Sequence, residues 1–351
     1  MTQAERQLPE QPRQPERVTL GDLSFGIYLP KKFITNEEIA KWGIITPNGN
    51  PLTAQDIQRR IGIKRRFIAG PDESVTDMGI KAALAAGNLE DVTAIIVSTS
   101  YPIGENVSEA IGRHLPKQPE FHLDIHAACS GFVRAFSFLK EHERKYNNKR
   151  VLLVATEKYS HTLTSLENGG IPIDSSMAQT IFSDGAVAIF FTYGRDVQVL
   201  AHESRKLPAE SDCYIRMPID ENLRTDPSLA IPIPNSTNGK LQQEGPKVIE
   251  AIFQSVPDLN KSVIEKSGIR PSDVRLLIPH QASGRMIPWL TKGMPEYNIF
   301  TDMDDGNFSS ASIPKAWARA IKEGRVQRGD TILLSGFGAG LYASSAVVQL
   351  Q

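Results

Sequence analysis

The chain has 351 residues, of which 40% are hydrophobic and 23% are charged, and its formal net charge at pH 7 is −1. This composition is typical of a globular protein with one large domain or two. The balanced charge, without a basic stripe, argues against a nucleic-acid-binding protein. The absence of an apolar run of about 18 residues argues against a transmembrane helix.

The two cysteines, Cys129 and Cys213, are too few for a disulfide framework and fit a reducing compartment. The N-terminal residues lack the apolar segment of a secretory signal, so we expect a cytoplasmic protein. Residues 1–17 are rich in Gln, Glu, Arg and Pro. Such a segment buries little apolar surface, which predicts a disordered leader.

From residue 18 onward, apolar runs alternate with amphipathic segments, which predicts an α/β fold with sheets covered on both faces. Strands are expected at 20–29, 92–98, 150–156, 186–191, 197–202, 274–279, 331–335 and after 340, and helices at 36–42, 56–61, 75–86, 107–115, 246–267, 282–290 and 311–323. The order begins again near residues 193–197, which predicts two similar halves, 18–195 and 196–351. A strand–helix unit carries Cys129 in the first half and His280 in the second.

Two further segments have open interpretations. The basic cluster Arg59, Arg60, Lys64, Arg65 and Arg66 is either a solvated face or a surface for ligand phosphates or an acidic carrier protein. The stretch 158–178 is long and irregular, which is typical of a functional or mobile loop.

Cys129 lies between a short strand and a helix, among small residues that would let a substrate carbonyl approach its sulfur. A helix N-terminus favours negative charge, so this position predicts a lowered thiol pKa and a nucleophilic thiolate. The alternative is a small buried hydrophobic residue, which is a common role of free cysteine.

His280 follows a buried strand, and Asn307 precedes a helix in the turn Asp-Gly-Asn at 305–307. Sites in α/β proteins form at the carboxyl ends of strands. A Cys, a His and an Asn together suit thiol acyl transfer, because the thiolate attacks a thioester carbonyl and the other two donate hydrogen bonds to its oxygen. The glycine run at 336–340 adds backbone N–H groups in a tight turn, and it lacks the Lys and Ser/Thr of a phosphate-binding loop.

Five ordered motifs carry a family resemblance: His-Ala-Ala-Cys-Ser-Gly-Phe at 126–132, Phe-Ser-Asp-Gly-Ala at 182–186, Pro-His-Gln-Ala at 279–282, Gly-Asn-Phe-Ser-Ser-Ala-Ser-Ile-Pro at 306–314 and Gly-Phe-Gly-Ala-Gly at 336–340. With them, nearly all of the chain after the leader resembles the thiolase-superfamily condensing enzymes, most closely β-ketoacyl-[acyl-carrier-protein] synthase III. The resemblance implies a five-layered αβαβα fold of two duplicated halves, usually a homodimer. It implies no metal and no cofactor beyond the phosphopantetheine of coenzyme A or acyl carrier protein.

The resemblance also implies roles for the candidate residues. Cys129 takes an acyl group from acyl-CoA or an acyl carrier protein, and malonyl-carrier protein then binds. His280 and Asn307 hold its thioester oxygen while it loses carbon dioxide, and the resulting enolate attacks the acyl group. The backbone N–H groups of Cys129 and Ala339 form the oxyanion hole.

Several positions depart from the family pattern. Asp56 replaces a tryptophan that commonly stacks on the coenzyme A adenine, which leaves a carrier-protein donor open. Arg60 remains as a basic partner, and Ser283 replaces an asparagine. Gly104 and Glu105 fall where a bulky pocket residue often lies. Arg60, Gly104, Glu105 and Ser283 are therefore candidate substrate or carrier contacts.

Two alternatives remain at this point. The acyl group on Cys129 could pass to another acceptor, or could join a second acyl chain head to head with Glu105 as base. Alternatively, the chain could be a non-catalytic subunit that binds an acyl carrier.

Overall fold

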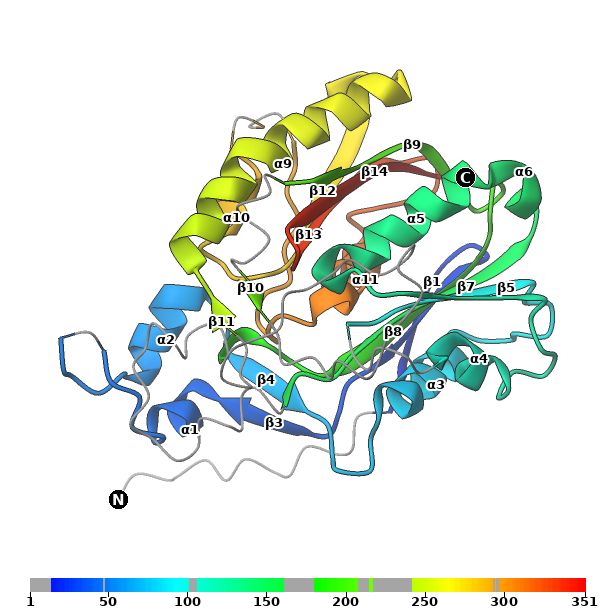
Figure 1. The fold of residues 1–351 in the computed structure, drawn as a ribbon. Coiled ribbons are helices and arrows are strands. Elements are labelled where there is room, and N and C mark those ends of the chain that lie inside the picture. Colours follow the sequence, from blue (N-terminus) through cyan, green and yellow to red (C-terminus); the bar gives the residue numbers. More distant parts are fainter. Residues whose placement is uncertain are drawn as a thin grey trace.

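The computed structural model describes residues 14–46, 48–100, 106–160, 180–207, 215–216, 242–292, 294 and 297–351. The described residues form two large sheets with helices between them and on both outer faces (Figure 1). They also form two small two-stranded sheets, one of β3 (Lys32–Thr35) and β4 (Arg65–Ile68) and one of β10 (Ile215–Arg216) and β11 (Gln242–Gln243). The predicted contacts Gly104 and Glu105, most of the 158–178 loop and Cys213 lie outside the described residues.

The first sheet has six strands, in the spatial order β1 (Glu16–Leu20), β2 (Leu23–Tyr28), β8 (Gly185–Thr192), β7 (Arg150–Glu157), β5 (Ala94–Ser98) and β6 (Phe121–Ile125). β7, β5 and β6 run parallel to one another, and the remaining neighbours are antiparallel. The central strands β8 and β5 are buried along their whole length, as expected for a sheet covered on both faces.

The second sheet has the order β12 (Val274–Pro279), β13 (Thr331–Gly338), β14 (Tyr342–Leu350) and β9 (Val197–Lys206). β12 is parallel to β13, and the other two pairs are antiparallel.

The helices complete five layers. α3 (Val75–Ala85) and α4 (Val107–Gly112) cover the outer face of the first sheet, and α9 (Gly245–Ser267) covers the second. α5 (Gly131–Glu141) and α11 (Ser312–Lys322) lie between the sheets, where Trp317 packs against Phe136 and Phe25 with ring centroids 6.0 Å and 5.3 Å away. The predicted αβαβα arrangement is confirmed.

The remaining elements are short. They are β3 (Lys32–Thr35), α1 (Asn36–Ala40), α2 (Ala54–Ile61), β4 (Arg65–Ile68), α6 (Glu143–Tyr146), β10 (Ile215–Arg216), β11 (Gln242–Gln243), α10 (Ile287–Leu290) and the 3₁₀ turns η1 (Ala128–Ser130), η4 (Pro271–Asp273) and η5 (Ser309–Ala311). Among the described residues, no helix is both long and apolar enough to span a membrane.

Strand order shows how the duplicated halves correspond. β2, β8, β7 and β5 match β9, β14, β13 and β12 in order and in relative direction. The middle helices α5 and α11 are then equivalent, and each follows a 3₁₀ turn. The predicted match between the Cys129 and His280 units was therefore wrong. The counterpart of the Cys129 turn is η5, which begins at Ser309, while His280 follows β12, the counterpart of β5.

Other differences have local causes. The predicted strand 20–29 is confirmed as β2 over Leu23–Tyr28, but Leu20 ends β1, because Gly21 adopts a φ of 61° and turns the chain into a hairpin. Glu16 and Arg17, placed in the leader by the sequence, belong to β1, where Glu16 pairs with Ile27. The predicted helix 282–290 begins only at Ile287, because the Gly284 N–H bonds the Ile61 carbonyl at 2.8 Å instead of a helical partner.

Candidate active site

The Cys129 turn is tight and strained. The first residue of η1, Ala128, has a φ of 44°, a region that residues with a Cβ rarely adopt. A Cβ on Gly131 would lie 2.1 Å from the Ser98 Oγ, so a side chain there would displace that hydroxyl. The absence of a side chain at Gly131 therefore lets Ser98 pack against the turn that presents Cys129.

The end of β13 packs directly on this turn. A Cβ built on Gly338 would lie 2.9 Å from the Ala127 carbonyl oxygen and 3.0 Å from the Cys129 nitrogen. The next residue, Ala339, is buried and shares a hydrophobic cluster with Ala128. The sequence placed the whole glycine run in a loop, yet residues 336–338 continue β13 and pair with β14. The backbone at Ala339 therefore lies beside the Cys129 turn.

We expect Gly338→Ala to slow acylation of Cys129 by about 10-fold, because its methyl group displaces the turn by a few tenths of an ångström. The acyl adduct would be followed by intact mass, with thermal unfolding measured alongside. Gly70→Ala is the control, since its Cβ would meet nothing closer than 3.5 Å. Wild-type acylation in a folded Gly338→Ala variant would contradict the prediction.

His280 is buried directly after β12, and its backbone N–H donates to the Ser335 carbonyl at 2.7 Å. Its ring meets Phe337 edge to face, with centroids 5.2 Å apart. Its Nδ1 has no hydrogen-bond partner among the described residues. Burial lowers the pKa of His280 to about 3, so the ring is neutral at physiological pH. A neutral ring with so low a pKa is a poor base and remains a hydrogen-bond donor.

Asn307 is fixed through both its backbone and its side chain. Its N–H donates to the Ile181 carbonyl at 2.8 Å, and its carbonyl accepts from the Ser183 N–H at 2.9 Å. Its Oδ1 accepts from the Ser309 N–H at 2.8 Å and the Ser312 Oγ at 3.2 Å. Because Oδ1 is engaged, the group that Asn307 can offer a ligand is its Nδ2 amide.

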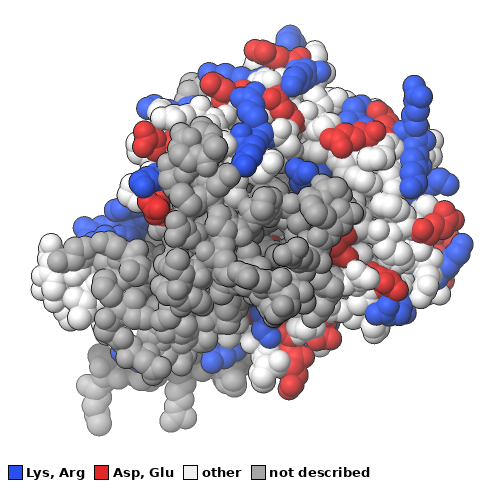
Figure 2. Space-filling model, in the orientation of Figure 1, with Lys and Arg blue, Asp and Glu red and all other residues white. Residues whose placement is uncertain are grey.

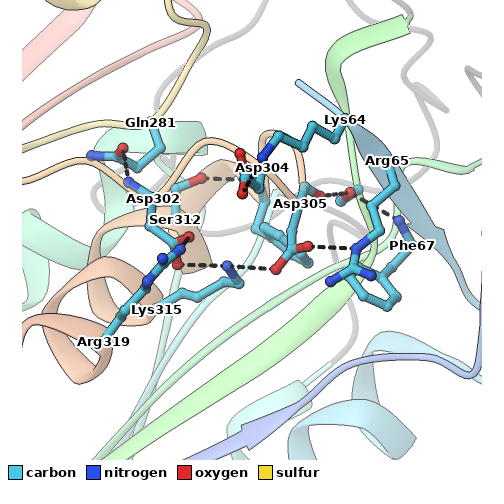
Figure 3. Close-up of polar contacts among 12 residues, drawn as sticks. Lys64, Arg65, Phe67, Gln281, Asp302, Asp304, Asp305, Ser312, Lys315 and Arg319 are labelled. Atoms are coloured by element: carbon cyan, nitrogen blue, oxygen red, sulfur yellow. Dashed lines mark hydrogen bonds and ion pairs between the residues drawn. The ribbon is translucent and has the colours of Figure 1, made fainter. Parts of the chain in front are cut away.

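An ion-pair clamp holds the segment that leads to Asn307 (Figure 3). We use this name for Asp302, Asp305, Lys315 and Arg65. The Lys315 Nζ lies 2.6 Å from Asp302 and 3.0 Å from Asp305, and the Arg65 Nε lies 2.7 Å from Asp305. Burial raises the pKa of Asp305, but Lys315 and Arg65 outweigh it and lower the pKa below its usual value.

The clamp also reaches the His280 loop. The Asp302 N–H donates to the Gln281 Oε1 at 2.8 Å. A single network therefore links the side chain of Gln281, which follows His280, to Asp305, which lies two residues before Asn307.

The comparisons with known proteins agree with this arrangement. Models of 3-oxoacyl-[acyl-carrier-protein] synthase III match residues 123–206, and models of its C-terminal part match residues 264–350. The β-ketoacyl-[acyl-carrier-protein] synthase III of Aquifex aeolicus is 32% identical over 327 residues, which cover 90% of this chain and 94% of that protein. The chain belongs to this synthase III family. It is therefore an acyltransferase of the condensing-enzyme type.

Solved structures support the same assignment. The synthase III of Thermus thermophilus is 26% identical, with a TM-score of 0.76 over 93% of this chain and 98% of that one. The priming β-ketosynthase of the R1128 polyketide pathway is also 26% identical, with a TM-score of 0.74 over 96% and 98%.

One expectation about this synthase III chain was wrong. The sequence predicted a lowered thiol pKa, but burial of the sulfur raises the pKa of Cys129 to about 12, even though the residue is partly exposed. The hydrogen bond with Ser309 partly offsets this, and the charge of Glu157 adds to it. The resting nucleophile is therefore a thiol, and it needs a proton acceptor before it can attack.

A buried polar network that the sequence did not predict lies next to Cys129. The Cys129 Sγ lies 3.3 Å from the Ser309 Oγ, which lies 3.1 Å from the Ser100 Oγ, which donates to Glu157 at 3.0 Å. A signal was present: Ser100 follows β5 and Glu157 ends β7, so both lie at the carboxyl ends of neighbouring parallel strands.

The predicted contacts Arg60 and Ser283 come from segments that touch. Arg60 lies in the last turn of α2, and Ser283 precedes Gly284, which bonds the end of that helix at Ile61. Asp56 has a structural role, because it forms the capping box of α2 with Thr53 and an ion pair with Arg59 at 2.8 Å.

The basic cluster is not one surface. Arg66 is fully buried and donates to the Thr180 carbonyl at 2.5 Å, and Arg65 belongs to the clamp. The exposed Lys64 pairs with Asp304 at 3.0 Å. Figure 2 shows positive and negative side chains mixed over the described part of the face drawn. A shared surface would need all five cations to be exposed. The interpretation of this basic cluster as a single binding surface is therefore wrong.

Proposed function

We propose that this chain catalyses a decarboxylative Claisen condensation. An acyl thioester transfers its acyl group to Cys129 and releases its carrier thiol. Malonyl-acyl carrier protein then loses carbon dioxide, and the enolate attacks the acyl–Cys129 carbonyl to give a β-ketoacyl product in fatty-acid or specialised lipid or polyketide synthesis. The contact between Cys129 and Ser309, two residues from Asn307, is the observation that carries this proposal, because it joins the nucleophile to the opposite half.

His280 and Asn307 take the role of hydrogen-bond donors to the malonyl thioester oxygen. The lowered pKa of His280 supports donation by a neutral ring, and the engaged Oδ1 of Asn307 supports donation from its Nδ2. The N–H groups of Cys129 and Ala339 stabilise the oxyanion when the acyl carbonyl is attacked. A well-placed donor of this kind contributes about 3 kcal/mol to transition-state stabilisation.

The carrier of the first acyl group is proposed to be acyl carrier protein rather than coenzyme A. Asp56 occupies the position of the expected stacking tryptophan and is committed to the α2 capping box. Arg60 and Ser283, at adjoining segments, are the proposed carrier contacts among the described residues. The proposal needs no resident cofactor, because phosphopantetheine arrives with the substrate.

Intact mass spectrometry tests the proposal. The protein would be incubated with acyl-CoA and acyl-carrier thioesters and then with malonyl-carrier protein, with Cys129→Ala beside it. We expect an acyl adduct on the wild type alone, which malonyl-carrier protein removes as a β-ketoacyl product. An adduct that malonyl carrier leaves unchanged would favour transfer to another acceptor or head-to-head condensation. No adduct from any donor would favour a non-catalytic carrier-binding subunit.

We further propose a cytoplasmic homodimer whose halves divide between residues 195 and 196. In support, the strands of the first sheet end at Thr192 and those of the second begin at Val197. Among the described strands, β6 is an edge of the first sheet, which offers unpaired backbone groups for a second copy. Light scattering of the purified protein would give its mass in solution.

A further inference from the structure

Glu157 is a buried carboxylate without a cationic partner. It has no exposed surface, and no lysine or arginine of the described chain pairs with it. Its oxygens accept from the N–H and Oγ of both Ser100 and Ser310, at 2.9 Å and 3.2 Å for the two N–H groups. Burying such a group is costly, and these bonds fix its orientation. A buried carboxylate that costs this much stability, next to a nucleophile, indicates that Glu157 takes part in the reaction.

The network gives this carboxylate a path to the nucleophile. The Ser100 Oγ donates to Glu157 and lies 3.1 Å from the Ser309 Oγ, which lies 3.3 Å from the Cys129 Sγ. Each step is within hydrogen-bond distance, and both serines can donate and accept. Ser309 has a φ of 49°, so a strained backbone holds its hydroxyl in place. Ala128, in the equivalent turn of the other half, has a similar positive φ.

We propose that Glu157 accepts the proton of the Cys129 thiol through Ser309 and Ser100 when the acyl group is loaded. This inference rests on the proposed function. The Ser309 Oγ takes the thiol proton and gives its own to the Ser100 Oγ, which gives its own to Glu157. The sulfur forms a bond to the thioester carbonyl carbon, and the bond to the carrier sulfur breaks. The proton then returns by the same path to the departing carrier thiolate, so neither hydroxyl nor carboxylate is consumed.

The titratable groups around Glu157 agree with this role. Burial raises the pKa of Glu157 to about 7, and the serine bonds partly offset it. The described titratable groups that face it are the Cys129 thiol and the Tyr159 phenol. Burial raises the pKa of Tyr159 well above its usual value, so it stays protonated. His280, with a pKa of about 3, is a poor competitor as a base.

Alkylation of Cys129 by iodoacetamide between pH 5.5 and 9 tests the inference without any thioester. The modified Cys129 peptide would be quantified by mass spectrometry, which separates it from Cys213. We expect the wild-type rate to rise with an inflection near pH 7, because only ionised Glu157 can accept a proton. Glu157→Gln and Ser309→Ala should lose this inflection and react about 10²-fold more slowly at pH 8. Glu157→Asp should restore part of the inflection and part of the alkylation rate.

Ser310→Ala is the matched control. It removes one hydrogen bond to Glu157 but leaves the path to Cys129 intact, so the inflection should persist at a higher pH. An inflection that survives in Glu157→Gln or Ser309→Ala, or a uniform slowing at every pH, would overturn the inference. If Glu157→Gln fails to fold, Ser309→Ala becomes the deciding variant. An alanine can adopt the positive φ required at position 309, because Ala128 adopts the same φ region in this protein. Failure of the condensation itself would leave the alkylation profile intact, so the two outcomes are distinguishable.

Discussion

His280→Ala is expected to load an acyl group onto Cys129 at nearly the wild-type rate but to condense it with malonyl-carrier protein about 10²–10³-fold more slowly. The reason is that the neutral ring donates to the malonyl thioester and takes no part in deprotonating the thiol. The two half-reactions would be measured separately, as adduct formation and as adduct consumption. Asn307→Asp should behave similarly, because it keeps the Oδ1 that bonds Ser309 but loses the donating amide.

His114→Ala serves as the control, because this exposed histidine lies after α4, outside the site. It should leave both half-reactions unchanged. If His280→Ala slowed loading as much as condensation, His280 would act on the Cys129 thiol, and its assignment as a donor to malonyl thioester would fail.

Lys315→Met is expected to lower the free energy of unfolding by about 2–3 kcal/mol at pH 7, because two buried carboxylates lose their shared cation. Asp302 keeps its ion pair with Arg319, and Asp305 keeps its ion pair with Arg65, so neither charge is left unpaired. Lys315 is 8% exposed, and Asp302 is 2% exposed. Urea unfolding would measure the loss. Condensation should also slow, since the clamp fixes the segment that carries Asn307.

The effect should depend on pH. The folded-state pKa of Asp305 is lowered, so the stabilisation by Lys315 is present above the unfolded pKa of about 4 and disappears as the pH falls through the lower folded value. Wild type and variant should therefore converge in acid. Lys322→Met is the control, because its exposed pair with Glu16 should contribute less than about 1 kcal/mol. An equally small loss for Lys315→Met would show that the clamp is not structural.

Much of this fold could be predicted from local patterns. The strand Val274–Pro279 and the helix Gly245–Ser267 match their predicted ranges to within a residue, because their periodicity is strong. The five motifs also indicated the family. The sequence could not show that residues 336–338 belong to a strand, because glycine is a poor strand former and its place there depends on the backbone of the Cys129 turn packed against it.

The environment of the site was harder to predict than its members. Glu157 is separated from Ser310 by 153 residues, so no local pattern predicts their hydrogen bonds or the burial that raises the pKa of Glu157. Arg66 appeared to be part of an exposed basic run, but packing against Thr180 and Asn36 places it in the interior. The pKa of Cys129 likewise depends on burial of its sulfur. This burial raises the pKa by more than the helix N-terminus, which is visible in the sequence, would lower it.

The contact between the Cys129 turn and η5 affects when activity appears during folding. Cys129 and Ser309 are 180 residues apart in the chain, so the contact that completes the site closes a long loop. Contacts of such separation carry a large entropic cost and tend to form late. A chain in which only the first half has folded would carry the thiol without Ser309 or Asn307. Gain of acylation during refolding should therefore lag behind the recovery of secondary structure and mark the moment when the two halves dock.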